Sequence, residues 1–164
     1  MPLHRHPALV PLSKDHHAAL QLALALRLDG SEHLRRRLPQ PTSALVAHVR
    51  RVFIEELEPH FRTEELELMV VVDGLDQELD ALCANLRREH ARMRLLIRAL
   101  AQTYIEAEQL ALLDQFGRLL EAHIRAEERA LFTRVQELLG GGTLAKIAPR
   151  LAARPGLVFP ERAI

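Results

Sequence analysis

The chain has 164 residues, 48% of them apolar, with 22 acidic and 22 basic side chains and a formal net charge of zero. This length and apolar content are sufficient for one domain with a packed core, and they argue against an intrinsically disordered chain. The balanced charge lacks the excess of basic side chains that nucleic acid or an anionic membrane would attract, so we expect neither as a partner. A single cysteine excludes an intrachain disulfide.

The first half of the chain contains the signals of two long helices and one short one. Ser13 is a suitable N-cap for a helix over 14–28, which an Asp-Gly pair would end. Residues 31–38 can add a short helix before two prolines break the chain. A long second helix is predicted over 43–72, with Thr42 as its cap.

The second half continues the helical pattern. A third helix is predicted over 76–102 and a fourth over 106–139, where three consecutive glycines end it, and a short helix follows over 144–153. No segment shows the alternation of a strand. We therefore predict an all-α protein: an antiparallel up-down four-helix bundle over 1–142, and a short extra C-terminal helix with a tail over 143–164.

The chain lacks the apolar segments that targeting or membrane insertion requires. No stretch of 18 apolar residues occurs, and residues 1–10 contain no run of signal-peptide length. We expect a soluble, cytoplasmic protein without a membrane partner.

Two stretches of the chain repeat one another. A shift of 63 residues aligns 53–68 with 116–131 and gives 8 identical residues in 16 positions. Both copies contain the motif H-x-R-x-E-E, once at 60–65 and once at 123–128. Around each motif, apolar residues recur at steps of three and four, which is typical of a buried helix face. The histidine and the first glutamate of each motif lie on that face.

These histidine–glutamate pairs are predicted to bind metal. His60 with Glu64, and His123 with Glu127, lie one helical turn apart on one face, about 5–6 Å from each other at Cβ. Buried carboxylates without partners are costly, and no arginine or lysine lies on the inner stripes of the second, third or fourth helix. A metal cation would neutralise the carboxylates, and neutral imidazoles would complete its coordination.

The first and third helices offer further histidines. The third helix has one inner histidine, His90, whereas the first has His16 and His17, of which only one can point inward. His17 has leucines three and seven residues after it. His16 has leucines four residues before and after it and, like His90, follows an acidic residue. The prediction leans slightly to His17 and keeps both candidates.

This set amounts to four imidazoles and two carboxylates. Six ligands are too many for one tetrahedral zinc ion with an open position. They suit two metal ions bridged by both carboxylates and an oxygen species, with one coordination position left for O2, NO, peroxide or water. Mixed imidazole and carboxylate ligands favour iron, with manganese or zinc as alternatives, over magnesium or calcium.

At this point the chain resembles the hemerythrin-like, or HHE cation-binding, family. The resemblance covers about residues 12–139. It rests on a histidine in the first and third helices and on H-x-x-x-E in the second and fourth, including the phrases LEPHFRTEE and EAHIRAEERALF. It implies a four-helix bundle around two iron ions bridged by carboxylates and an oxo or hydroxo group. It also implies a protein that binds, senses or handles O2, NO or reactive oxygen species.

Two departures narrow the resemblance. The family's invertebrate oxygen carriers have a second histidine on the third helix, where this chain has Arg94. They also use H-x-x-x-x-D on the fourth helix, where this chain has His123 and Glu127 in H-x-x-x-E. The chain therefore looks like the six-ligand bacterial branch, which argues against plain oxygen carriage.

Two other functions fit the same residues. The centre could belong to an oxidoreductase that consumes peroxide or NO, or to an iron-responsive regulatory or interaction module. No dedicated acid, base or substrate pocket is evident in the sequence, and nothing in it sets the oligomeric state. Among the remaining residues, Glu65 and Glu128 are expected to pair with Arg62 and Arg125, and Cys83 is expected in the core.

Overall fold

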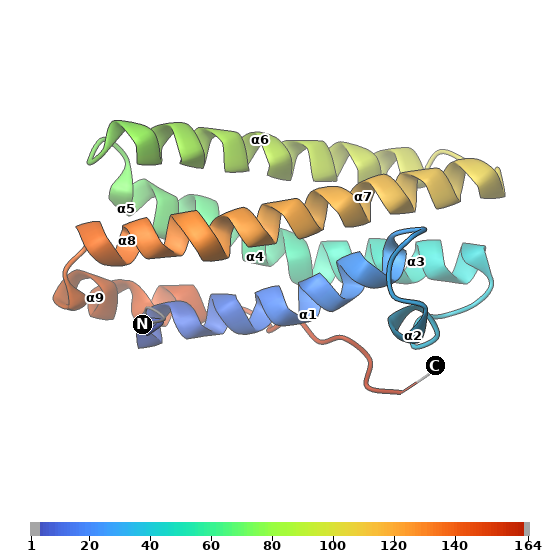
Figure 1. Ribbon diagram of the computed structural model, residues 1–164, viewed down its shortest axis with the longest axis horizontal. Coiled ribbons are helices and arrows are strands. Elements are labelled where there is room, and N and C mark those ends of the chain that lie inside the picture. Colours follow the sequence, from blue (N-terminus) through green and yellow to red (C-terminus); the bar gives the residue numbers. More distant parts are fainter. Residues whose placement is uncertain (1–3, 163–164) are drawn as a thin grey trace.

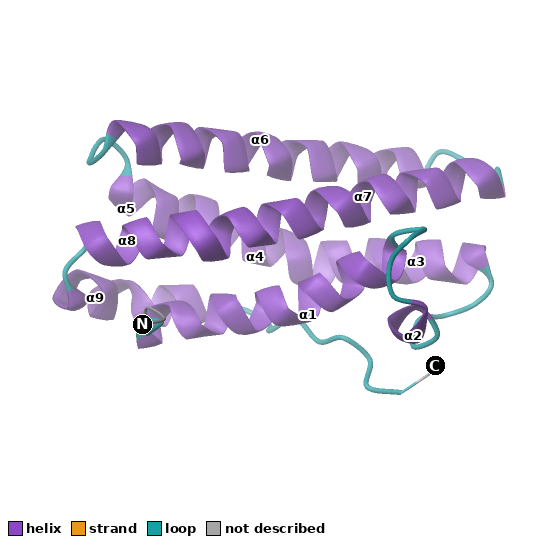
Figure 2. Ribbon diagram, viewed as in Figure 1, coloured by secondary structure: helices purple, strands orange, loops and turns teal. Residues whose placement is uncertain are grey.

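The computed structural model describes residues 4–162, and within this range the chain forms helices and loops but no strand (Figure 2). The long helices lie side by side along the length of the molecule (Figure 1). The prediction of an all-α protein is therefore confirmed, and the helices pack together as a bundle. No helix in the described part of the chain is long and apolar enough to cross a membrane.

The first rod consists of a 3₁₀ turn, η1 (Pro7–Leu9), and helix α1 (Val10–Leu26). The short helix α2 (Glu32–Arg35) follows, with Ser31 capping it through a hydrogen bond from the Leu34 amide to the Ser31 side chain. The prediction that Ser13 caps the first helix was wrong. Helix α1 begins three residues before Ser13, whose hydroxyl donates to Glu128 instead.

The second rod is continuous from Thr42 to Val72 but changes its helical pitch along the way. It contains α3 (Thr42–Val52), a π-helical turn η2 (Phe53–Leu57), α4 (Glu58–Thr63), a second π-helical turn η3 (Glu64–Met69) and α5 (Val70–Val72). The prediction that Thr42 caps this helix was wrong, because its hydroxyl donates to Glu106 instead.

The third rod is α6 (Gln77–Leu100), and the fourth contains α7 (Glu106–Ala126), the π-helical turn η4 (Glu127–Leu131) and α8 (Phe132–Leu138). The C-terminal helix α9 (Gly141–Ala152) begins earlier than the predicted residue 144, because Gly140 ends the loop and the next two glycines already belong to the helix. After α9 the chain runs back along the side of the bundle (Figure 1).

The sequence repeat is also a structural repeat. One π-helical turn begins at Glu64 and another at Glu127, the equivalent positions of the two motifs. A π-helical turn inserts a wider turn into an α-helix and is frequent at functional sites, because it changes the direction of the side chains that follow. The repeat thus preserves the backbone turn at the two glutamates, although the π-helical turn η2 of the first copy has no counterpart in α7.

The interior contains two apolar clusters separated by polar side chains. Along each of the four rods, residues of one cluster are followed by a buried histidine, glutamate or aspartate and then by residues of the other. Phe116 lies in one cluster and Phe132 in the other, both 0% exposed. Cys83 is buried among apolar side chains as predicted, and burial raises the pKa of its thiol to about 11, so it stays protonated. The fold therefore presents a polar layer within an otherwise apolar core.

Candidate metal centre

Six polar side chains from all four rods meet in this layer, and each is at most 3% exposed. They form two groups in which one ligand atom per residue lies within 4.8 Å of the others, and both glutamates belong to both groups. The groups are His16, His60, Glu64 and Glu127, and Glu64, His90, His123 and Glu127.

The structure corrects the prediction for the first helix. His16 is buried in the cluster, whereas His17 is exposed to solvent. Successive residues of a helix point about 100° apart, so the two cannot both face inward. The buried face of α1 runs through Leu12, His16, Ala19 and Ala23, whereas Leu20 and Leu24, three and seven residues after His17, are only partly buried. Two alanines follow His16 on the buried face, so the spacing of leucines after His17 did not mark the inner side.

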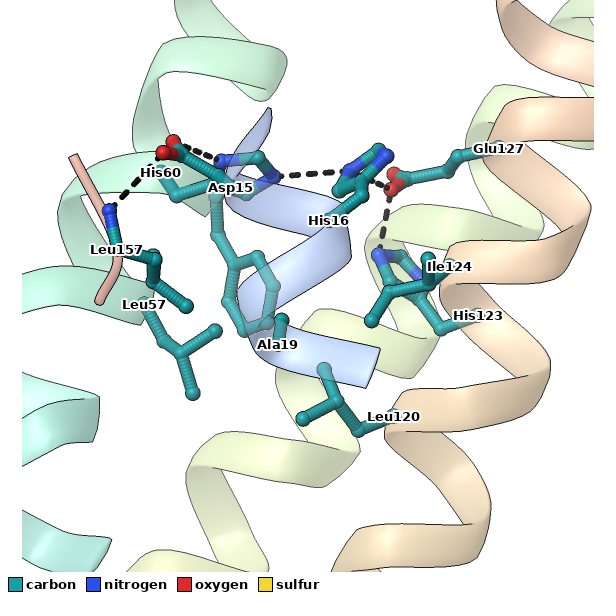
Figure 3. Close-up of a pocket in the computed structure, with 11 residues that line it drawn as sticks. Asp15, His16, Ala19, Leu57, His60, Leu120, His123, Ile124, Glu127 and Leu157 are labelled. Carbon is teal, nitrogen blue, oxygen red and sulfur yellow. Dashed lines mark hydrogen bonds and ion pairs between the residues drawn. The ribbon is translucent and has the colours of Figure 1, made fainter. Parts of the chain in front are cut away.

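In the first half of the layer, the Nε2 atoms of the His16 and His60 rings face one another. The Nδ1 of His16 lies 2.7 Å from Glu128, and the Nδ1 of His60 lies 2.9 Å from Asp15. A carboxylate accepts a hydrogen bond, so each Nδ1 carries the hydrogen and each Nε2 keeps a lone pair in the neutral ring. The two Nε2 atoms are 3.1 Å apart (Figure 3). Glu64 Oε1 lies 3.2 Å from the Nε2 of His16 and 2.9 Å from that of His60.

The second half repeats this arrangement. The Nδ1 of His90 lies 2.7 Å from Glu65, and the Nδ1 of His123 lies 2.8 Å from Glu89. The Nε2 atoms of the two rings are 2.9 Å apart, and Glu127 Oε1 lies 3.0 Å from that of His123. Each acidic residue outside the cluster therefore fixes the ring of a histidine on a different rod, and the two halves are related as the two motifs are.

The donor set fits cations better than it fits any partner within the protein. In each half, the Nε2 atoms of two imidazoles converge with carboxylate oxygens, and in the neutral rings these nitrogens carry lone pairs. Glu64 Oε2 and both carboxylate oxygens of Glu127 are buried without a hydrogen-bond partner among the described residues. Buried polar atoms are almost always satisfied, and such carboxylates are satisfied by metal ions. Imidazole and carboxylate groups at this spacing can hold a cation in each half.

Comparison with known proteins gives the same result. A family model described as the hemerythrin HHE cation binding domain matches residues 9–135. The chain belongs to this family. Searches of curated proteins and of solved structures find no match. The matched range contains all six clustered residues, whereas α9 and the residues after it lie beyond this range.

The electrostatics of the HHE site favour positive charge. Burial alone would lower the pKa of His123, but the charge of Glu127 raises it to about 10. The pKa values of His16 and His90 are raised as well, because hydrogen bonds to the surrounding carboxylates outweigh burial. Conversely, the imidazoles lower the pKa values of Glu64 and Glu127 against the effect of burial. The metal-free HHE domain therefore holds protons where cations would bind.

The acidic residues that orient the HHE histidines have their own partners, which the sequence analysis missed. Glu128 accepts hydrogen bonds from Ser13 at 2.7 Å and from Arg5 at 2.6 Å, and Glu65 accepts one from Arg94 at 3.1 Å. The arginines expected beside them bond within their own rod instead, Arg62 to Glu58 and Arg125 to Glu121. A usable signal was present in the sequence, since an acidic residue directly precedes His16 and His90.

Aromatic rings pack on two of the HHE histidines. Phe61 stacks on His90 with ring centroids 4.1 Å apart, and Phe132 stacks on His16 at 5.2 Å. These contacts and the Nδ1 hydrogen bonds restrict both the tilt and the rotation of the imidazoles. The site is thereby held in one geometry before any ion arrives.

A small pocket adjoins the HHE site. It is closely packed and leaves no free space for a water-sized molecule. Polar groups line one side, and the remaining wall is apolar: Ala19, Leu57, Phe61, Leu120, Ile124 and Leu157. The packing therefore excludes organic ligands of ordinary size.

Proposed function

We propose that this protein holds two iron ions in a dinuclear centre and uses them to bind or sense O2, NO or peroxide. The helical rods would form the antiparallel up-down four-helix bundle that was predicted, with the ligands inside it. The observation that carries the proposal is the pair of facing Nε2 atoms in each half, 3.1 Å and 2.9 Å apart, with unsatisfied carboxylate oxygens beside them.

The six clustered residues would together hold the two ions. His16 and His60 would hold one ion, His90 and His123 the other, with the two carboxylates shared by both halves. When bound, the iron pair would supply redox chemistry and an open position for a small ligand. The choice of iron rests on the mixture of imidazole and carboxylate donors, which manganese or zinc also accept.

The pocket supports a small ligand in particular. A diatomic ligand would need only a small displacement of this closely packed, largely apolar wall, whereas an organic substrate would need a large one. Arg94, which stands where oxygen carriers of the family have a histidine, is bonded to Glu58 and Glu65 and lies outside the ligand cluster. This arrangement supports sensing or handling of the ligand over simple carriage.

The test is metal content and its spectroscopic response. Protein prepared without metal is loaded anaerobically with Fe²⁺, desalted, and analysed for iron per chain by mass spectrometry. We expect two iron ions per chain, and an absorption band that changes on exposure to O2, NO or hydrogen peroxide. The variant His17→Ala is the matched control, because His17 is exposed and should leave the iron content unchanged. Less than one iron per chain, with none regained on repeated loading, would refute the proposal.

A further inference from the structure

The C-terminal segment, which consists of α9 and the residues after it, reaches the metal centre although it lies beyond the matched part of the chain. After α9, the Arg154 side chain turns inward and is only 5% exposed. Its Nη2 donates to Asp15 Oδ2, and its Nη1 donates to the Leu151 carbonyl at 2.9 Å. The amide of Leu157 donates to the other oxygen, Asp15 Oδ1, at 2.9 Å (Figure 3).

These contacts continue into the proposed ligand set. Asp15 is 4% exposed and accepts the Nδ1–H of His60, whose Nε2 faces the cluster. Both oxygens of Asp15 are therefore held by the C-terminal segment, and their position sets the rotation of the His60 ring. Leu157 also lines the pocket beside the site. A chain of contacts thus links Arg154, through Asp15 and His60, to one half of the centre.

Burying the Arg154 guanidinium is energetically costly. A guanidinium loses its hydration when it is buried, and this loss is recovered only through good ionic and hydrogen-bonded contacts. Its one salt bridge among the described residues is to Asp15, and its Nε is buried without a partner. The arrangement therefore leaves an imperfectly satisfied cation inside the protein, directed at one carboxylate.

In the other half of the centre, no arginine holds the carboxylate that is equivalent to Asp15 among the described residues. There, Glu89 holds the Nδ1 of His123 as Asp15 holds that of His60, but Glu89 accepts its further hydrogen bond from the neutral Asn85, at 2.9 Å. The two-fold relation of the halves is broken at this point. The broken relation predicts that removing the arginine affects one half only.

We infer that Arg154 is a positioning residue for the ion held by His16 and His60, so that the C-terminal segment is a functional part of the metal centre. The inference rests on the proposed dinuclear centre. Arg154 keeps the Asp15 carboxylate in place, Asp15 holds the Nδ1–H of His60, and the lone pair on Nε2 is thereby aimed into the site. Without Arg154, the His60 ring loses the group that fixes its rotation.

The test compares metal retention in full-length variants loaded with Co²⁺, a divalent ion that imidazole and carboxylate ligands accept and that can be followed by its absorption. The wild type, Arg154→Gln and the matched control Arg150→Gln are dialysed against increasing EDTA. Arg150 lies in the preceding helix α9 and pairs with Glu67 at the surface, so its loss should not affect the site. We expect the wild type and Arg150→Gln to keep two ions under conditions in which Arg154→Gln keeps one.

The size of the effect follows from the behaviour of groups that orient metal ligands, whose loss costs about 10- to 100-fold in metal affinity. The weakened ion should be the one whose absorption is also lost in His16→Ala. Hydrogen exchange of the segment around Leu157 in the metal-free protein gives a second reading. That exchange should be faster in Arg154→Gln, because Asp15 is then free to leave the Leu157 amide.

The outcomes separate this inference from the proposed function. A wild type that takes up fewer than two ions would refute the dinuclear centre and this inference with it. Two ions in the wild type, retained equally well in Arg154→Gln, would refute the inference alone. Should Arg154→Gln fail to fold, Arg154→Lys keeps the buried charge but loses the forked contact. One of its two ions should leave several-fold faster than in the wild type, and equal rates would overturn the inference.

Discussion

Loading the centre with metal should release protons, because the metal-free site already holds them. His16, His90 and His123 have raised pKa values in the metal-free protein. A metal ion binds to the lone pair of neutral imidazole, so each charged ring must lose its proton first. We expect two to three protons to be released at pH 7 when both halves of the site are filled.

The cost of that release can be worked out for His123. Its pKa of about 10 lies three pH units above pH 7. At about 1.4 kcal/mol per pH unit, deprotonating this ring at pH 7 costs metal binding ~4 kcal/mol. That cost falls as the pH rises toward about 10. The affinity for the pair of ions should therefore increase by about 100-fold per pH unit above neutrality when two protons are displaced.

The assay is isothermal titration calorimetry of the metal-free protein with Co²⁺ at pH 7, in two buffers whose ionisation enthalpies differ. The difference in the measured heat gives the number of protons released per chain. Repeating the titration between pH 6.5 and pH 8.5 gives the slope of affinity against pH. Fewer than one proton released, or an affinity that does not change with pH, would refute the electrostatic reasoning.

The stability of the metal-free protein should depend on pH in the opposite direction. A raised pKa, as for His123, stabilises the fold fully below the unfolded value of about 6.5, and this contribution is lost as the pH rises to about 10. The lowered pKa of Glu64 stabilises the fold above about 4.5 and is lost as the pH falls. Urea unfolding of the metal-free protein should show the highest stability between about pH 4.5 and about pH 6.5. An unchanged midpoint between pH 5.5 and pH 9 would contradict this.

Three further results are expected. His16→Ala should reduce the bound ions from two to about one per chain, whereas His17→Ala should leave both; equal losses would contradict the placement of these residues. Gly117→Ala should lower the free energy of unfolding by about 1–3 kcal/mol, because the new Cβ would lie 2.7 Å from the Ala23 carbonyl oxygen. Gly140→Ala, which meets nothing within 4 Å, is its control in urea denaturation. Removing the metal by chelation should lower the unfolding free energy by about 2.7 kcal/mol for each site at which the free metal concentration had been about 100 times the Kd. An unchanged melting temperature would refute metal-linked folding.

The repeated motif predicted much of the site because ligand spacing on one helix is a local property. His60 and Glu64, like His123 and Glu127, are one turn apart in any helix, and the apolar residues around them indicate which face is buried. The long helices followed from the same periodicity. The helix ends were less accurate, as at Ser13, because a hydroxyl that can cap a helix can also bond to a distant carboxylate.

The sequence by itself therefore determined that helices would form, which faces would be buried, and that histidines and glutamates would lie on those faces. The tertiary structure decided what those faces meet. It selected His16 over His17, because the way α1 packs on the other rods buries His16 and leaves His17 in solvent. It also set which carboxylate orients which ring, and it brought Arg154 to Asp15 across 139 residues of sequence. Such contacts depend on how the rods are placed against one another, which no spacing within a single helix specifies.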